Sequence, residues 1–210
     1  MDAEDASDDD LAESYRVLQL THRWLGNTAA VLRLLPHPPL TFKRALDIGC
    51  GHGGLLLEIR KRFNVDVIGF DLRPPPAQSV VPILSGNAVS DALPEADVAI
   101  CVMMAHHLSE AELAGLIGNV SRSCPRLILL DLVRHRVPLW LFRLFVAPFL
   151  GRINALDGET SVRRAYTEVE MREIVAGALR DGDRPVKSLR HTVAPLWTRQ
   201  VVDISWEPWV

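Results

Sequence analysis

Short apolar runs alternate with amphipathic segments through the middle of the chain. The apolar runs predict strands at 44–48, 65–70, 80–84, 97–102 and 126–132. Apolar positions at helical spacing predict helices over 53–63 and 109–122, and prolines predict a turn at 74–76. Strands that alternate with helices in this order form a parallel sheet covered on both faces, so the pattern predicts a doubly wound α/β fold.

Different patterns flank this alternating region. Helical spacing over 11–35 predicts one or two helices, which Pro36, Pro38 and Pro39 end. In the last third, the pattern predicts an apolar segment at 137–150, a polar loop at 151–166 and a helix at 167–180. It also predicts two strands, at 186–193 and 199–206. We expect the two strands to pair antiparallel at the edge of the sheet. The whole pattern therefore predicts seven strands in a mostly parallel sheet with an antiparallel edge strand and an N-terminal helical addition.

Composition and charge limit the domain count and the partners. The 210 residues are 48% hydrophobic, which suits one domain, 14–210. Residues 1–13 hold seven acids and no base, which predicts a disordered acidic tail. No Lys/Arg-rich stripe is present, so we expect no nucleic-acid partner. No apolar stretch reaches the length of a membrane span and the first residues lack a basic leader, so we expect no integral membrane contact.

The three cysteines bear on compartment and metal binding. Cys50, Cys101 and Cys124 lie at wide spacings inside apolar runs. This spacing gives neither a disulfide framework nor a metal knuckle, so it favours a reducing, cytoplasmic location and no metal site.

A glycine-rich turn follows the first predicted strand, in the order Asp47-Ile48-Gly49-Cys50-Gly51-His52-Gly53-Gly54. Glycine at 49 and 51 permits backbone angles closed to other residues and lets a ligand approach the main chain, while the next helix points its N-terminus at that ligand. The spacing of Gly49, Gly51 and Gly54 equally fits a dinucleotide-binding turn. An acid that ends the second strand, Asp71, can accept the hydroxyl hydrogens of a ribose in either case.

Asp47 separates the two kinds of ligand. An acid two residues before the first glycine would repel a pyrophosphate and attract a cation. The turn therefore favours a nucleoside ligand that carries positive charge.

Residues 47–53 resemble the first motif of class I S-adenosylmethionine-dependent methyltransferases, and the similarity extends over roughly 44–132, including 86–88 and 99–108. The resemblance implies a Rossmann-like sheet, S-adenosylmethionine as cofactor, and a set of cofactor-binding residues. These are Asp47, Gly49, Cys50, Gly51, Gly53, Asp71, Leu72, Asn87, Ala88 and Met103. Asn87 stands where many members have an aspartate, and its amide still offers a carbonyl acceptor.

Two adjacent histidines follow the fourth strand, at the edge where open α/β sheets bind ligands. His106 or His107 is our candidate for the catalytic base or for a group that orients the acceptor. The alternative is that both begin the following helix and shape the pocket floor. Asp131 ends the fifth strand without the adjacent acid or amide of a magnesium-dependent catechol methyltransferase, so the resemblance implies metal-free chemistry.

Residues 137–166 are the candidate acceptor side, a lid or insertion. The 137–150 segment is apolar except for Arg143, so with Trp140 it could cover a pocket for an aromatic or lipid-like acceptor. It could instead be a core-packing or dimer-forming helix, or lie on a membrane surface.

The next residues resemble a segment of bacterial methyltransferases that modify quinones and polyketides, which implies that Arg164 and Tyr166 hold an acidic or phenolic acceptor. Arg164 could alternatively pair with Asp157 or Glu159. Thr167 and Glu170 predict a capping box for the helix that follows.

These observations predict a methyltransferase that modifies oxygen or carbon of a small hydrophobic or phenolic molecule, as a monomer or homodimer. Two rivals remain. A nicotinamide (NAD or NADP) oxidoreductase shares the turn and the ribose acid but gains nothing from Asp47. A catalytically inactive, cofactor-binding subunit would use the apolar 137–150 face to bind a partner.

Overall fold

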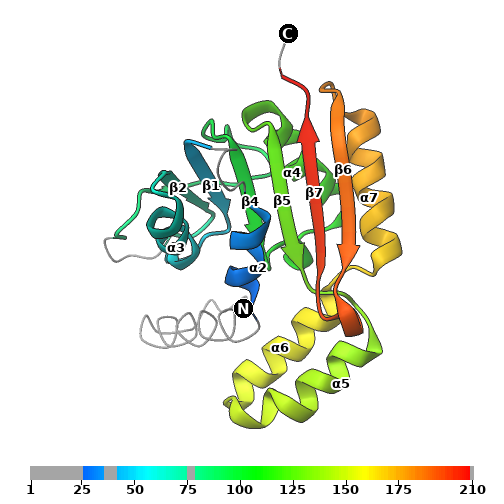
Figure 1. Cartoon of the computed structure of the whole chain (residues 1–210). Coiled ribbons are helices and arrows are strands. Elements are labelled where there is room, and N and C mark those ends of the chain that lie inside the picture. Colours follow the sequence, from blue (N-terminus) through cyan, green and yellow to red (C-terminus); the bar gives the residue numbers. More distant parts are fainter. Residues whose placement is uncertain (1–25, 36–41, 75–78, 209–210) are drawn as a thin grey trace.

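A seven-stranded sheet forms the centre of the molecule in the computed structural model, which describes residues 26–35, 42–74 and 79–208 (Figure 1). The strand order is β3-β2-β1-β4-β5-β7-β6. The strands are β1 Arg44–Ile48, β2 Asp66–Asp71, β3 Ile83–Ser85, β4 Val98–Val102, β5 Arg126–Asp131, β6 Val186–Val193 and β7 Gln200–Trp206. The first five pair in parallel, and β7 pairs antiparallel with both β5 and β6, which confirms the predicted fold class.

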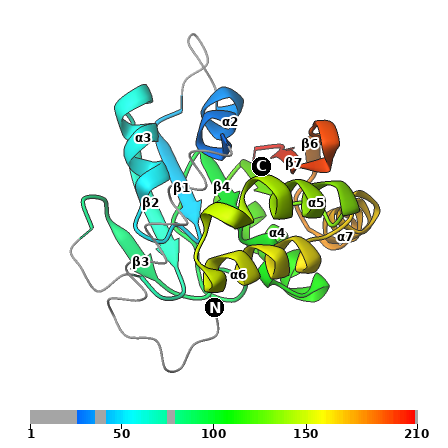
Figure 2. The same cartoon turned by 90° about the horizontal axis from the view of Figure 1, so that it is seen from below.

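Helices cover both faces of the sheet (Figures 1 and 2). α2 Asn27–Leu34 and α3 Gly54–Phe63 lie on one face, and α4 Glu110–Ser123 and α7 Glu168–Asp181 lie on the other. α5 Arg136–Phe145 and α6 Arg152–Arg164 form a hairpin beyond the end of the sheet, and η1 Ala105–His107, η2 Ala147–Phe149 and η3 Pro195–Trp197 are short 3-10 helices. Alternate residues of β5 show why two layers form. Leu127 and Leu129 pack with α4 and α7, whereas Ile128 and Leu130 pack with α2 and α3.

Capping boxes fix where two of these helices begin. The Ser109 side chain caps α4 together with Glu112, and the Thr167 side chain caps α7 together with Glu170. Each box satisfies helix N–H groups that have no partner within the helix, a contribution of about 1 kcal/mol. The predicted box at Thr167 is confirmed.

The structure corrects the prediction of a polar loop at 151–166, because α6 spans Arg152–Arg164. Few apolar residues and a central glycine made this segment read as a loop. Gly158 instead packs directly on the Phe142 ring, where a Cβ atom would clash, so tertiary contact with α5 explains the glycine. The third strand is also shorter than predicted, at Ile83–Ser85.

Several predictions lie wholly or partly outside the described residues. They are the acidic tail 1–13, the 11–25 part of the N-terminal helices, and most of the proline turn at 74–76. Within the described ranges, none of the helices combines the length and the apolar character that crossing a bilayer requires.

Candidate active site

A cleft of about 710 Å³ opens at the carboxyl ends of β1 and β4. These two strands are neighbours in the sheet, but their following connections lead to opposite sides of it. Ligands bind open α/β sheets at such a point, because the diverging connections leave a crevice. Residues from the glycine turn, the ends of β2 and β4, η1 and the starts of α2 and α4 line the cleft.

The glycine turn has the backbone geometry that its sequence predicts. Gly49, Gly51 and Gly53 have φ values of 71°, 51° and 73°, in the left-handed region that favours glycine. A Cβ atom at Gly49 would lie 2.8 Å from Cγ of Met104, and one at Gly53 would lie 2.5 Å from Cγ2 of Val81. A side chain at either position would therefore strain the turn and collide with its surroundings.

Asp71 is locked against this turn by backbone N–H groups. Its Oδ2 accepts a hydrogen bond from Gly51 N at 2.8 Å, and its Oδ1 accepts one from Arg73 N at 2.9 Å. The carboxylate keeps further lone pairs that face the cleft. This fixed orientation suits a carboxylate that must accept two neighbouring hydroxyl groups.

Asp47 lies at the bottom of the cleft and is only 3% exposed. Among the described residues, none donates a hydrogen bond to its carboxyl group. Burial, and secondly the negative charge of Asp71, raises the pKa of Asp47 to about 8. A buried acid without a donor is costly to ionise. A cation bound in the cleft would supply the missing partner.

All the predicted cofactor-binding residues except Gly53 line this one cleft. Gly53 is buried behind the turn, and Gly54 takes its place in the lining. The side-chain carbonyl of Asn87 accepts a hydrogen bond from Val89 N at 3.0 Å, and its second lone pair and the amide nitrogen stay available to a ligand. Met103 is a non-glycine residue with a φ of 56°, and its N–H donates to Leu130 O at 2.8 Å.

The two adjacent histidines occupy different environments. His107 lines the cleft and has an exposed face, whereas His106 is buried. Desolvation on its covered side, followed by the charge of His106, lowers the pKa of His107 below its usual 6.5. The imidazole of His107 is therefore neutral at pH 7 and can accept a proton. The two rings lie 4.2 Å apart, centroid to centroid.

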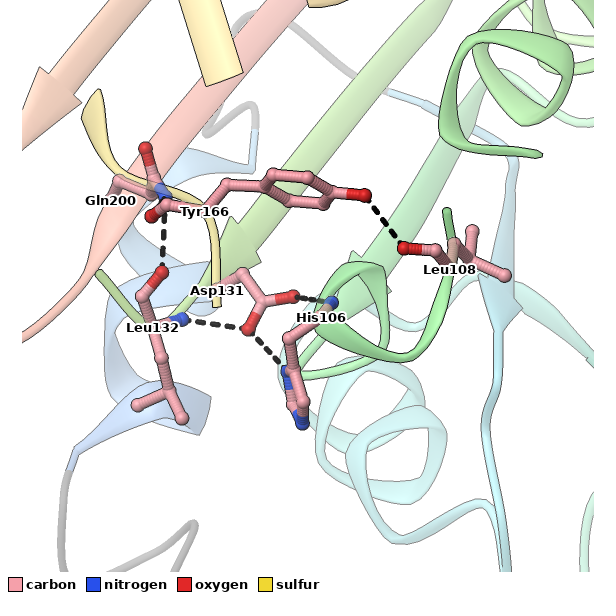
Figure 3. A network of polar contacts seen from close by, with 6 residues as sticks. All are labelled: His106, Leu108, Asp131, Leu132, Tyr166 and Gln200. Atoms are coloured by element: carbon pink, nitrogen blue, oxygen red, sulfur yellow. Dashed lines mark hydrogen bonds and ion pairs between the residues drawn. The ribbon is translucent and has the colours of Figure 1, made fainter. Parts of the chain in front are cut away.

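His106 instead anchors η1 to the end of β5 (Figure 3). Its Nδ1 lies 2.7 Å from Asp131 Oδ1, and its backbone N donates to Asp131 Oδ2 at 2.9 Å. Leu132 N also donates to Asp131 Oδ1, at 2.7 Å. The Asp131 carboxylate is thus surrounded by donors although it is nearly inaccessible to water. This pair holds the loop that presents His107.

The three predicted acceptor contacts lie outside the cleft lining. Tyr166 is buried, and its hydroxyl donates to Leu108 O at 2.6 Å (Figure 3). Burial is the main reason that the pKa of Tyr166 is raised. Trp140 is 70% exposed on α5, and Arg164 is exposed at the end of α6. The alternative pairing for Arg164 is not found either, because Glu159 binds Arg143 at 2.6 Å and Arg163 at 4.0 Å.

Sequence reasoning missed lining residues that come from helices. Asn27 and Thr28 at the start of α2 line the cleft. The apolar spacing of this helix predicted only an N-terminal addition to the fold, without a role in the site. Their signal is a polar pair after Gly26 at the start of an otherwise apolar helix. The sequence pattern also gave Asp131 no role beyond ending a strand. A single carboxylate directly after the apolar run 127–130 is the feature that could have indicated a buried partner for a histidine.

The chain is similar to a known sequence family and to several solved structures. The sequence model described as "Methyltransferase domain" matches residues 18–146. No curated protein matches the chain. Human N-acetylserotonin methyltransferase, solved with SAM, is similar over 95% of this chain and 56% of its own, with 13% identity and a TM-score of 0.65.

Two further solved structures share the fold, and their sequence identities to this chain are also low. The plantazolicin methyltransferase BpumL, solved with SAH, is similar over 94% of this chain and 90% of its own, with 13% identity and a TM-score of 0.71. The mitomycin 7-O-methyltransferase MmcR is similar over 97% of this chain and 59% of its own, with 16% identity and a TM-score of 0.66. This chain thus spans little more than half the length of the human protein and of MmcR.

Proposed function

The chain belongs to the methyltransferase domain family, and from that premise we propose that it methylates oxygen or carbon of a small hydrophobic or phenolic acceptor. S-adenosylmethionine is the cofactor of this family. One observation carries the proposal for the site: the cleft that holds the glycine turn, Asp47 and Asp71 also holds His107. A cation-attracting carboxyl and a neutral proton acceptor thus face the same space.

The residues of the cleft fit the cofactor in shape and in charge. The turn lets a ligand approach its backbone because no side chain stands there. Asp47 would attract the ammonium group of the methionine part, and Asp71 would accept the ribose hydroxyls. Leu72 is 64% exposed at the cleft and would pack on the adenine, with Asn87 donating from its amide nitrogen. When bound, S-adenosylmethionine supplies an electrophilic methyl group on a positively charged sulfur.

His107 would act on the acceptor. Its neutral imidazole would accept the hydroxyl proton of the acceptor as that oxygen takes up the methyl group that the bound cofactor supplies. The buried pair of His106 and Asp131 keeps η1 in place. The backbone of His107 is therefore already positioned before an acceptor binds. Tyr166 has a supporting role, because its hydroxyl holds Leu108, the cleft residue after His107.

The acceptor would enter beside α6. This helix contacts η1, and together with the largely apolar α5 it forms a hairpin at the carboxyl edge of the sheet. An apolar neighbourhood next to a neutral histidine favours an acceptor that combines a hydrophobic body with one ionisable hydroxyl. The likeness to the mitomycin 7-O-methyltransferase MmcR supports oxygen as the methylated atom.

Calorimetric titration with S-adenosylhomocysteine tests the cofactor, with NAD and NADP titrated in parallel. We expect only S-adenosylhomocysteine to bind, and Asp71→Ala to weaken it about tenfold or more, because hydrogen bonds to a charged group are lost. Lys43, which lies outside the cleft lining, offers a control as Lys43→Ala. Binding of a nicotinamide cofactor would make the protein an oxidoreductase.

A panel of phenols, quinone precursors and lipids, assayed with radiolabelled methyl donor, tests the reaction. We expect methylation of a phenolic member and loss of turnover in His107→Ala, with cofactor affinity unchanged. Cofactor binding without turnover on any acceptor, together with a partner that co-purifies in equal amount, would instead indicate an inactive binding subunit.

A further inference from the structure

The α5–α6 hairpin, residues 136–164, carries five large apolar side chains that are exposed: Trp140, Leu144, Phe145, Phe149 and Leu156. On α5 the exposed residues Arg136, Trp140 and Leu144 lie four positions apart and form one stripe. Phe149 in η2, which follows α5, is 85% exposed. Leu156 adds an exposed apolar side chain on α6. Large side chains therefore face water at positions where the helix could have carried polar residues.

The inner face of the hairpin already has its partners. Pro138 is buried, and the Phe142 ring packs on Gly158 of α6. Arg143 and Glu159 form an ion pair between the two helices at 2.6 Å. Figure 2 shows α5 and α6 side by side, and Figure 1 shows the pair beyond the end of the sheet. The outward side chains are thus not needed to join the two helices.

The charge of the hairpin is opposite in sign to that of the chain. Residues 136–164 hold five arginines and two acids, a net charge of +3, whereas the full chain has a net charge of −3. Arg136 begins the stripe on α5, and Arg152 lies exposed at the start of α6. Exposed arginines therefore flank the tryptophan and the phenylalanine.

We propose that this face docks on the surface of an anionic lipid bilayer. A helix in the interface places aromatic and leucine side chains among the acyl chains and its arginines at the phosphate level. Each arginine near an anionic surface adds to the attraction. A second copy fits this face less well, because a symmetric pair would bring together two surfaces that each carry a net charge of +3.

Docking in this way would turn the carboxyl edge of the sheet toward the bilayer. The hairpin follows β5 at that edge, and α6 contacts η1, which carries His107. A hydrophobic acceptor could then reach the cleft from the lipid phase. This consequence rests on the proposed function, whereas the docking itself does not.

Co-sedimentation of the full chain with vesicles tests the proposal without any methylation assay. We expect binding to phosphatidylcholine vesicles that contain phosphatidylglycerol, weaker binding at high salt, and little binding to pure phosphatidylcholine. Trp140→Ser with Phe149→Ser should weaken binding about tenfold or more. Arg136→Glu and Arg152→Glu should each weaken it about fivefold or more.

Matched controls lie on other elements. Leu189→Ser on β6 and Arg180→Glu on α7 remove an exposed apolar residue and an exposed charge far along the sheet, and should leave vesicle binding unchanged. Unchanged affinity for S-adenosylhomocysteine shows that each variant is folded. The proposal is overturned if the chain ignores anionic vesicles, if the hairpin and control variants behave alike, or if light scattering shows a dimer that the hairpin variants dissociate while lipid binding is absent.

Discussion

The two halves of the carboxyl edge of the sheet are built in different ways. On the cofactor side, the turn after β1 is held by backbone hydrogen bonds to Asp71 and by glycines that tolerate no side chain. On the acceptor side, the α5–α6 hairpin contacts the body through few buried residues and exposes Trp140 and Phe149. A rigid site for a shared cofactor thus lies next to a more exposed surface, which we propose faces the acceptor.

The largest expected effect lies where the two halves meet. His107→Ala should lower kcat about 10²- to 10⁴-fold by removing the proton acceptor, with the Kd of S-adenosylhomocysteine unchanged. Because the pKa of His107 is lowered, the rate of the native enzyme should fall only as the pH drops below 6.5. Steady-state kinetics across pH checks both points. An unchanged kcat in His107→Ala would leave His107 with only a structural role.

Removing the anchor behind His107 should act on stability. Asp131→Ala leaves Nδ1 of His106 and the N–H groups of His106 and Leu132 without their acceptor in a buried site. We expect the free energy of unfolding to fall by about 3 kcal/mol, measured by urea denaturation. Asp131→Asn keeps one acceptor oxygen and should fall between the native protein and Asp131→Ala. Equal stability of all three would contradict the role of this pair.

Asp47 provides a pH-dependent test of the cofactor side. With a pKa of about 8, its carboxyl is protonated at pH 7 in the free protein, and a bound cation would ionise it. Binding of S-adenosylhomocysteine at pH 7 should therefore release up to about one proton and strengthen as the pH rises toward 8. Calorimetry in buffers of different ionisation enthalpy measures this release. Asp47→Asn should abolish it.

The raised pKa of Asp47 also makes the stability of the free protein depend on pH, and here a higher pH is unfavourable. The folded state holds a proton on Asp47 between the ordinary pKa of 3.8 and about 8, where the unfolded chain has lost it. The free energy of unfolding should therefore contain a component that falls as the pH rises through that window, and Asp47→Asn should lack it. Urea denaturation of both proteins at several pH values measures the difference.

The smallest expected effect is on the hairpin. Trp140→Ser with Phe149→Ser should change the free energy of unfolding by no more than about 0.5 kcal/mol per site, because both side chains are mostly exposed. Thermal denaturation without lipid checks this. A large loss of stability would show that the outer face of the hairpin is packed in solution, which would remove the contrast between the two halves.

Much of the cofactor side could be predicted because its signals are local. The run 47–54 needs glycine for its backbone angles, and Asp71 follows a strand whose end must lie at the same sheet edge. The continuous apolar run of β5 similarly indicated a strand covered on both faces. These constraints act within a few residues, so they can be read along the chain.

The acceptor side was harder because its residues act across long separations. Tyr166 has the residue type of a phenol-binding group, yet its hydroxyl is used by Leu108, 58 positions away. Gly158 has the residue type of a loop, yet it lies inside α6 to admit Phe142. Residue type alone does not show which hydrogen-bond partner or ring will be adjacent after folding.

The sequence by itself determined the order of the strands, the glycine turn and the two acids beside it, since periodicity and backbone angles are properties of neighbouring residues. Only the tertiary structure decided that His107 faces the cleft while His106 is buried on Asp131, although the two are adjacent in the chain. Side chains of adjacent residues point in different directions, and the packing of η1 against β5 determines which of the two is buried.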